Sequence, residues 1–178
     1  MDRYSRELRW LHWGVAFLVL IQIQIALTLA GLPGGASEGR GIGLAAWHTA
    51  IGLLIALAMI ARIVLRLRQG APRIEGRIAP AAHLAHAGIY LLILGLVATG
   101  YVKIAALGAP VPLPGGLALP GLAGDPALAA QAQRLHTLFG NTLVGLLMLH
   151  VAAAMAHGTV LPGKVLYKMM PGEGRPER

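Results

Sequence analysis

Long apolar stretches alternate with short charged ones along this chain. Four stretches carry no Asp, Glu, Lys or Arg, at residues 10–32, 41–61, 78–102 and 135–163. About 20 apolar helical residues, rising 1.5 Å each, cross the roughly 30 Å hydrocarbon layer of a membrane. The pattern therefore predicts one all-α domain over residues 1–178, with four membrane-spanning helices at about residues 6–32, 41–68, 80–106 and 131–160.

A fifth uncharged stretch, residues 104–124, has a different composition. It carries Pro110, Pro112, Pro114 and Pro120 among several glycines. Proline removes a backbone donor, and lipid offers nothing that replaces the lost hydrogen bond. We therefore predict a loop at the membrane surface over residues 107–131.

The overall composition excludes a water-soluble protein. Hydrophobic residues make up 56% of the 178 residues and charged residues only 12%, with a mean hydropathy of +0.67. A soluble domain is about 25% charged, and a disordered chain needs low hydrophobicity. The first apolar run exceeds the 7–15 apolar residues of a signal peptide and contains His12 and Gln22. We expect it to be a retained helix.

The basic residues predict the orientation in the membrane. Of the 15 Lys and Arg residues, all but Arg40, Lys103 and Arg134 precede the first helix, lie between the second and third, or follow the fourth. With four spans, these three regions share one face. The positive-inside rule puts that face, and both termini, in the cytoplasm. The net charge of +8 therefore reflects topology, and we expect no nucleic-acid partner.

Histidine is the only strong metal ligand available, because the chain has no cysteine. The seven histidines lie in or beside the predicted helices: His12, His48, His83, His86, His136, His150 and His157. His136 and His150 are 14 residues apart, which returns them to nearly one helix face about 21 Å apart along the axis. That distance is too long for one metal ion and suits two stacked haems.

Depth in the membrane restricts which histidines can share a haem. On the outer side only His48 is level with His136. On the cytoplasmic side His12 matches His150, but His86 could replace either one. Two imidazoles on one iron favour electron transfer over oxygen binding.

These residues resemble the bacterial cytochrome b561 family. The resemblance rests on Tyr4-Ser5, Leu11-His12-Trp13, Trp47-His48, His83-Leu84-Ala85-His86, Leu135-His136, His150-Val151-Ala152-Ala153-Ala154, Ala156-His157 and Met169-Met170-Pro171. It covers nearly the whole chain in order. It implies a four-helix protein of the bacterial inner membrane with two b haems. By similarity, His12 and His150 would ligate the cytoplasmic-side iron, and His48 and His136 the periplasmic-side iron.

The resemblance also implies electron exchange with ubiquinone, for which His86, His157 and Arg77 would line a site for the quinone or for haem propionates. Similar members act as superoxide oxidases, which take electrons from periplasmic superoxide. Lys103 is then the candidate for guiding the anion, although it could instead only extend to the membrane interface. The alternative is a haem-binding membrane anchor and electron-transfer subunit for a separate dehydrogenase or soluble redox protein. A haem-free transporter or structural bundle is a third class.

Overall fold

Four long helices dominate the computed structural model, which describes residues 3–33, 40–70, 79–159 and 165–170. The long helices are α1 (Arg6–Gly31), α2 (Arg40–Gln69), α3 (Ala79–Ala105) and α4 (Pro126–Thr159), and the short helix α5 (Val165–Met169) follows. All 4 long helices are apolar enough to cross a membrane. The four-span prediction is confirmed.

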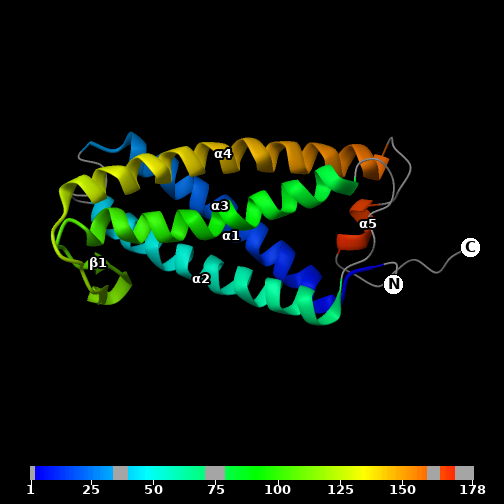
Figure 1. The fold of residues 1–178 in the computed structure, drawn as a ribbon, viewed down its shortest axis with the longest axis horizontal. Helices are drawn as coiled ribbons and strands as arrows, with labels where there is room; N and C mark the ends of the chain where they lie inside the picture. The colour runs from blue at the N-terminus through cyan, green and yellow to red at the C-terminus, as the bar shows by residue number, and fades with distance from the viewer. Residues whose placement is uncertain (1–2, 34–39, 71–78, 160–164, 171–178) are drawn as a thin grey trace, which may run out of the picture.

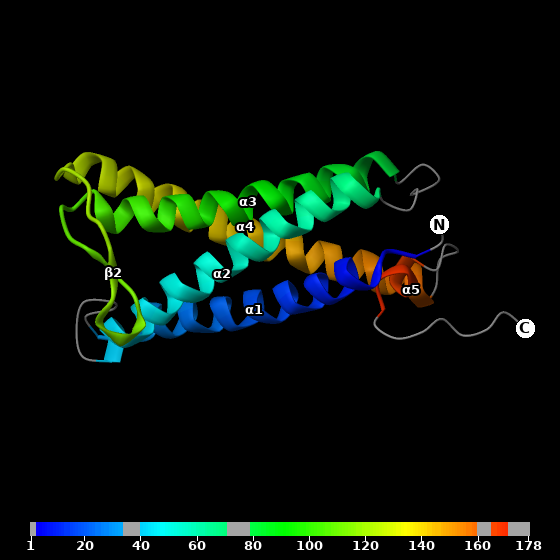
Figure 2. The ribbon, with the colours of Figure 1, turned by 90° about the horizontal axis from the view of Figure 1, so that it is seen from below.

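The long helices run side by side as an up-and-down bundle (Figures 1 and 2). α4 packs mainly on α3, and α1 packs mainly on α2. The start of α1, the end of α4 and α5 lie together at one end, which we call the terminal end. The connection between α3 and α4 lies at the opposite end, which we call the hairpin end (Figure 1).

The outer surface of the bundle is apolar. Leu20, Leu91 and Met148 are 67%, 72% and 70% exposed. Such large apolar side chains face water rarely in a soluble protein, but here they face lipid.

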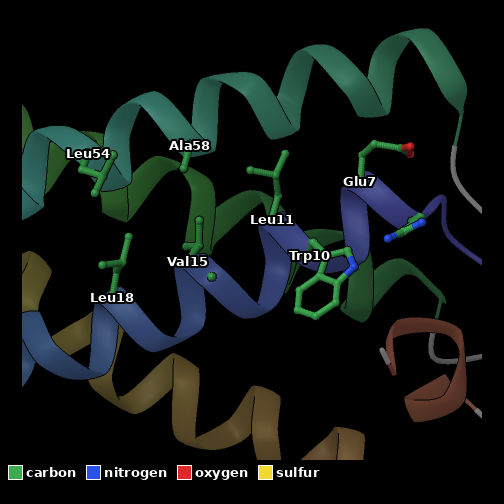
Figure 3. A pocket seen from close by; sticks show the side chains of 9 residues that line it. Glu7, Trp10, Leu11, Val15, Leu18, Leu54 and Ala58 are labelled. Atoms are coloured by element: carbon green, nitrogen blue, oxygen red, sulfur yellow. The ribbon is translucent and has the colours of Figure 1, made fainter. Parts of the chain in front are cut away.

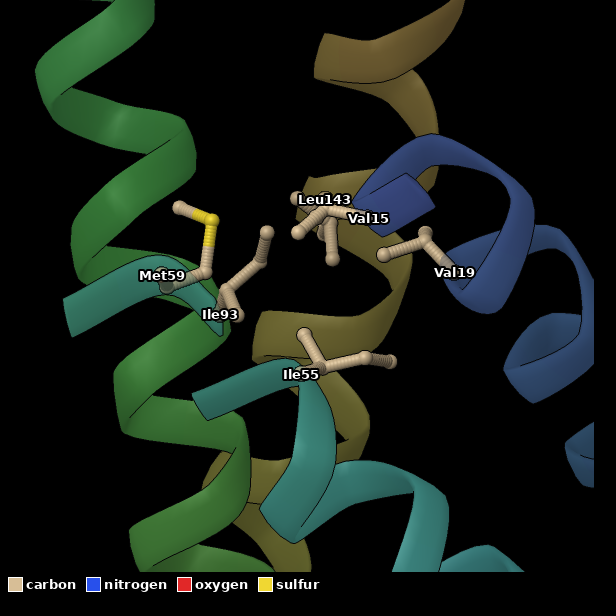
Figure 4. Close-up of a cluster of buried hydrophobic side chains, with 6 residues drawn as sticks. All are labelled: Val15, Val19, Ile55, Met59, Ile93 and Leu143. Atoms are coloured by element: carbon tan, nitrogen blue, oxygen red, sulfur yellow. The ribbon is translucent and has the colours of Figure 1, made fainter. Parts of the chain in front are cut away.

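A small hydrophobic cluster fills the middle of the bundle (Figure 4). All four long helices contribute to it, through Val15, Val19, Ile55, Met59, Ile93 and Leu143. Met59 is only 2% exposed and Ile55 3%. The bundle therefore has an apolar central layer between its two ends.

Helix α4 begins five residues earlier than the sequence predicts, at Pro126 instead of 131. The Asp125 carboxylate accepts a hydrogen bond of 3.0 Å from the Leu128 backbone N–H and so caps the helix. Proline suits the first helical position because its missing N–H would have no partner there. The prediction was wrong because it treated Pro126 as a loop residue.

The connection between α3 and α4 contains no spanning segment, as predicted. Strands β1 (Val111–Pro112) and β2 (Ala118–Leu119) pair antiparallel around the turn η1 (Pro114–Gly116). Backbone hydrogen bonds from Leu122 to Ala105 and from Asp125 to Ala106 tie this hairpin to the end of α3. The hairpin also contacts α2, so it folds over the bundle instead of extending from it.

At the terminal end, α5 is attached to α1 by side-chain donors. Trp13 Nε1 donates to the Met169 carbonyl at 2.8 Å, and Arg3 and Arg9 donate to the Met170 carbonyl. Cationic and N–H donors satisfy the carbonyls at a helix C-terminus, which carries partial negative charge. These contacts fix the first turns of α1 near α5.

Glycine allows α3 and α4 to approach closely. A Cβ on Gly95 would lie 3.0 Å from the Phe139 ring, and one on Gly88 would lie 3.2 Å from Leu146. These two glycines therefore act as helix-packing residues.

Candidate functional site

Two histidines face each other at the hairpin end, His48 from α2 and His136 from α4. Their ring centroids are 6.3 Å apart and their planes meet at 66°. His136 Nδ1 lies 3.0 Å from the Leu96 carbonyl and 3.2 Å from Thr99 Oγ1. A neutral imidazole that donates from Nδ1 to a carbonyl leaves Nε2 as its metal-binding atom. This contact leaves His136 Nε2 available to bind a metal ion.

Gln22 and Gly100 are neighbours of this pair on α1 and α3. Gln22 Nε2 donates to the His48 carbonyl at 2.8 Å, while Gln22 Oε1 and His48 Nδ1 are buried without a hydrogen-bond partner. A Cβ on Gly100 would lie 3.1 Å from His136 Cε1. Gly100 thus leaves the space that the His136 ring occupies.

Three histidines gather at the terminal end, His12 from α1, His86 from α3 and His150 from α4. The His12 and His150 ring centroids are 6.3 Å apart at 66°, and those of His86 and His150 are 5.5 Å apart at 68°. The structure therefore brings together the histidines that sequence spacing left as alternatives.

Ligation of one iron by two imidazoles requires a particular distance between the ring centres. Two imidazoles on opposite sides of one metal, each bound at about 2 Å, have ring centres roughly 6 Å apart. The 6.3 Å pairs fit this requirement at both ends. The 5.5 Å separation of His86 and His150 is shorter than it. The donor geometry thus fits haem iron and favours His12 over His86 as the partner of His150.

The other possible metal ligands of the described residues form no competing site. Within the described ranges, no group of three or more His, Asp or Glu side chains could hold a metal ion. The central cluster of Val15, Val19, Ile55, Met59, Ile93 and Leu143 lies between the two histidine pairs. An apolar layer therefore separates the two histidine pairs.

Two arginines inside the bundle were not recognised as site residues from the sequence. Arg62 Nη1 donates to His12 Nδ1 at 2.7 Å, and Arg66 Nη1 lies 3.5 Å from the Tyr90 hydroxyl. In the sequence both were interpreted as charges that set the membrane topology, although the predicted second helix, residues 41–68, already included them. In the structure both lie in α2 and contact side chains of α1 and α3. The signal that could have found Arg62 is its spacing of 14 residues from His48, which matches the spacing of His136 and His150.

The remaining predicted site residues lie near the two centres or outside the described residues. Lys103, near the end of α3, is half-buried and interacts electrostatically with His48 and His136. His157 lies in the last turns of α4, and its Nδ1 is buried without a partner. Arg77 lies outside the described residues.

An open groove lies between α1 and α2 (Figure 3). Its wall is mostly apolar, and the Glu7 carboxylate lies near one end of it. Trp10, Leu11, Gly14, Leu18, Leu54 and Ala58 are among its lining residues. No histidine is among its lining residues, so the groove is distinct from both histidine pairs.

Comparison with known proteins agrees with this arrangement. A model of the family described as prokaryotic cytochrome b561 matches residues 3–172. A protein of Yersinia pestis described as "Probable superoxide oxidase CybB" is 30% identical over 166 residues, which are 90% of this chain and 94% of that protein. Cytochromes b561 are bacterial membrane proteins that bind haem b and transfer electrons. The family model covers all four long helices and both histidine pairs, so this chain belongs to the prokaryotic cytochrome b561 family.

Proposed function

We propose that this protein holds two b haems and moves electrons across the bacterial inner membrane, from superoxide at the periplasmic face to ubiquinone. One observation carries the proposal. Two histidine pairs with the same 6.3 Å separation lie at opposite ends of the bundle. A pair at each depth is what a chain of two redox centres through a membrane requires.

His12 and His150 are proposed to ligate the haem iron at the terminal end, and His48 and His136 the iron at the hairpin end. Six-coordinate b haems supply one-electron transfer with little change in geometry. The Leu96 carbonyl orients the His136 ring for this role. The central cluster around Met59 excludes water from the space between the two centres.

The orientation is proposed from charge. Arg3, Arg6, Arg9 and Lys168 lie at the terminal end, and α2 ends there with Arg66 and Arg68. The hairpin end carries Arg40, Lys103 and Arg134. The positive-inside rule then places the terminal end, with both termini, in the cytoplasm and the hairpin in the periplasm.

Lys103 is proposed to guide superoxide toward the hairpin-end centre. It is half-buried and lies close enough to His48 and His136 to interact with both electrostatically. A cation recessed beside a reaction centre attracts a small anion and raises its rate of encounter. The printed name of the Yersinia pestis relative, which describes a superoxide oxidase, supports this choice of donor.

His86 and His157 are proposed to serve ubiquinone at the terminal end, with Arg77 as a further candidate from outside the described residues. The Nδ1 atoms of both histidines are buried without a hydrogen-bond partner. Each imidazole can hold a proton at that atom and release it to a quinone oxygen. Ubiquinone needs such donors because its reduction takes up two protons.

The test is ubiquinone reduction by superoxide with no other protein present. In the balanced reaction two superoxide anions are oxidised to two O₂, and one ubiquinone takes up two electrons and two protons to form ubiquinol. We expect purified protein in lipid nanodiscs to form ubiquinol with this stoichiometry. If superoxide does not reduce the haem, the proposal fails, and the anchor for a separate dehydrogenase becomes the better account.

A further inference from the structure

Two arginines on α2 enter the interior of the bundle at the terminal end. Arg62 and Arg66 lie one helical turn apart, and both are half-buried. Arg62 interacts electrostatically with His12, His86 and His150, and Arg66 interacts with His86. Both cations therefore lie beside the centre that we assign to His12 and His150.

Helix periodicity explains why Arg62 faces the site. It follows His48 by 14 residues on α2, as His150 follows His136 on α4. Fourteen residues return a helix to nearly the same face about 21 Å along its axis. α2 thus presents a histidine to the hairpin-end centre and an arginine to the terminal-end centre.

The contact between Arg62 and His12 is incompatible with iron ligation through Nε2 by a neutral imidazole. A guanidinium has donors only, so the 2.7 Å contact makes His12 Nδ1 an acceptor. A neutral histidine that binds metal through Nε2 carries its hydrogen on Nδ1. Two donors cannot share this contact, so iron binding frees Arg62 to bond elsewhere.

The described part of the chain offers no carboxylate to the released arginine. Its acidic residues are Glu7, which is exposed on α1, and Asp125, which caps α4 at the opposite end. A partly buried cation needs an anion close by. Haem carries two propionate carboxylates, and a guanidinium binds a carboxylate with two parallel hydrogen bonds.

We propose that Arg62 and Arg66 bind the propionates of the terminal-end haem and make it the more easily reduced of the two haems. The inference rests on the proposed pair of haems. Nearby positive charge favours the ferrous state, which carries one positive charge fewer than the ferric state. The two arginines thus favour electron arrival at the terminal end.

The hairpin end differs from the terminal end in its nearby positive charge and in the hydrogen bond at the histidine Nδ1. Among the described cations of this end, Lys103 is the one that interacts electrostatically with His48 and His136. His136 donates from Nδ1 to the Leu96 carbonyl. That hydrogen bond makes the imidazole a stronger donor to the metal, which favours the ferric state. Both differences direct electrons from the hairpin end toward the terminal end.

The experiment is an equilibrium redox titration of the full-length haem protein, followed by haem absorbance. We compare the unmodified protein with Arg62→Gln and Arg66→Gln, and use Arg68→Gln as the matched control because Arg68 is exposed on the same helix. A His136→Ala background, in which only the terminal-end haem is expected, assigns each step to its haem.

We expect Arg62→Gln to shift the ferric–ferrous equilibrium of the terminal-end haem at least tenfold toward ferric, equivalent to 59 mV for one electron. In Arg62→Gln, the equilibrium of the hairpin-end haem should shift less than threefold. In the Arg68→Gln control, the equilibria of both haems should shift less than threefold. Arg62→Lys keeps the positive charge and should therefore leave the ferric–ferrous equilibrium close to that of the unmodified protein. Selective loss of the terminal-end haem from Arg62→Gln, with retention in Arg62→Lys, also supports the proposal.

The inference is overturned if the Arg62→Gln and Arg66→Gln proteins keep two haems with unchanged potentials, if both haems shift equally, or if the terminal-end haem becomes easier to reduce. Finding no haem in the unmodified protein would instead overturn the proposed function. The two failures are therefore distinguishable.

Discussion

The two ends of the bundle hold histidine pairs of the same geometry in different surroundings. Both pairs have centroids 6.3 Å apart at an angle of 66°. At the hairpin end, His136 contacts a backbone carbonyl, whereas at the terminal end His12 contacts a guanidinium. The shared geometry supports the proposal that each end holds one haem, and the different neighbours support the proposed difference in redox behaviour.

A third histidine ring lies against the terminal-end pair, whereas the hairpin-end pair has no third histidine ring beside it in the described residues. The ring centroids of His86 and His150 are 5.5 Å apart. Gly100, which follows His86 by 14 residues on α3, faces the His136 ring. The same face of α3 thus provides an imidazole at one end and room for the His136 ring at the other. This difference supports the proposed quinone site at the terminal end.

The largest expected effect comes from removing one ligand at the hairpin end. His136→Ala should lose the hairpin-end haem and keep the other, because the pairs lie on opposite sides of the central cluster. The haem-to-protein ratio should fall from two to one in a pyridine haemochrome assay. Exposed His83→Ala is the control and should keep both haems. Loss of both haems from His136→Ala would contradict two independent sites.

The next prediction separates His12 from His86. His12→Ala should lose the terminal-end haem, since only the His12–His150 separation fits two ligands on one iron. His86→Ala should keep two six-coordinate haems and lose ubiquinone reduction instead. Haem content and electron paramagnetic resonance measure the first, and ubiquinol formation measures the second. The reverse result would make His86 the ligand.

A smaller effect is expected at Lys103. Lys103→Gln should slow reduction of the hairpin-end haem by superoxide about tenfold at low ionic strength, because the guiding charge is gone. Stopped-flow absorbance measures this rate. Added salt screens the charge and should therefore reduce the difference in reduction rate between Lys103→Gln and the unmodified protein. Arg134→Gln serves as a same-end control, and an equal loss there would argue against a special role for Lys103.

The smallest predicted effect concerns the space beside His136. Gly100→Val should lower the free energy of unfolding by about 1–3 kcal/mol, because its Cβ would lie 3.1 Å from the His136 ring. The hairpin-end haem should be held more weakly, and the terminal-end haem should not change. Gly43→Val, where a Cβ meets nothing within 4 Å, should have neither effect. Equal haem loss from both variants would show that Gly100 does not make room for His136.

Sequence patterning predicted the four spans because membrane helices need long apolar runs, and it excluded residues 104–124 because prolines are costly in lipid. The 14-residue spacing also predicted two depths of histidine. It could not choose between His12 and His86, because helical rise gives depth but not the lateral distance between helices. Only the packed bundle shows 6.3 Å for one pair and 5.5 Å for the other.

Arg62 was missed for a different reason. Positive residues near a helix end are usually topology signals, and Arg62 follows directly after an uncharged stretch. Its role depends on which face of α2 turns inward, and packing decides that. The start of α4 was missed because Asp125 and Pro126 also suit a loop, and only the Asp125 hydrogen bond to Leu128 distinguishes a helix cap.

The central claim is that each histidine pair holds one haem. The most direct measurement is the haem-to-protein ratio of the purified full-length chain, combined with electron paramagnetic resonance of the oxidised state. The account predicts two b haems per chain, both low-spin and six-coordinate. A ratio of one or less, or a five-coordinate high-spin haem, would contradict it.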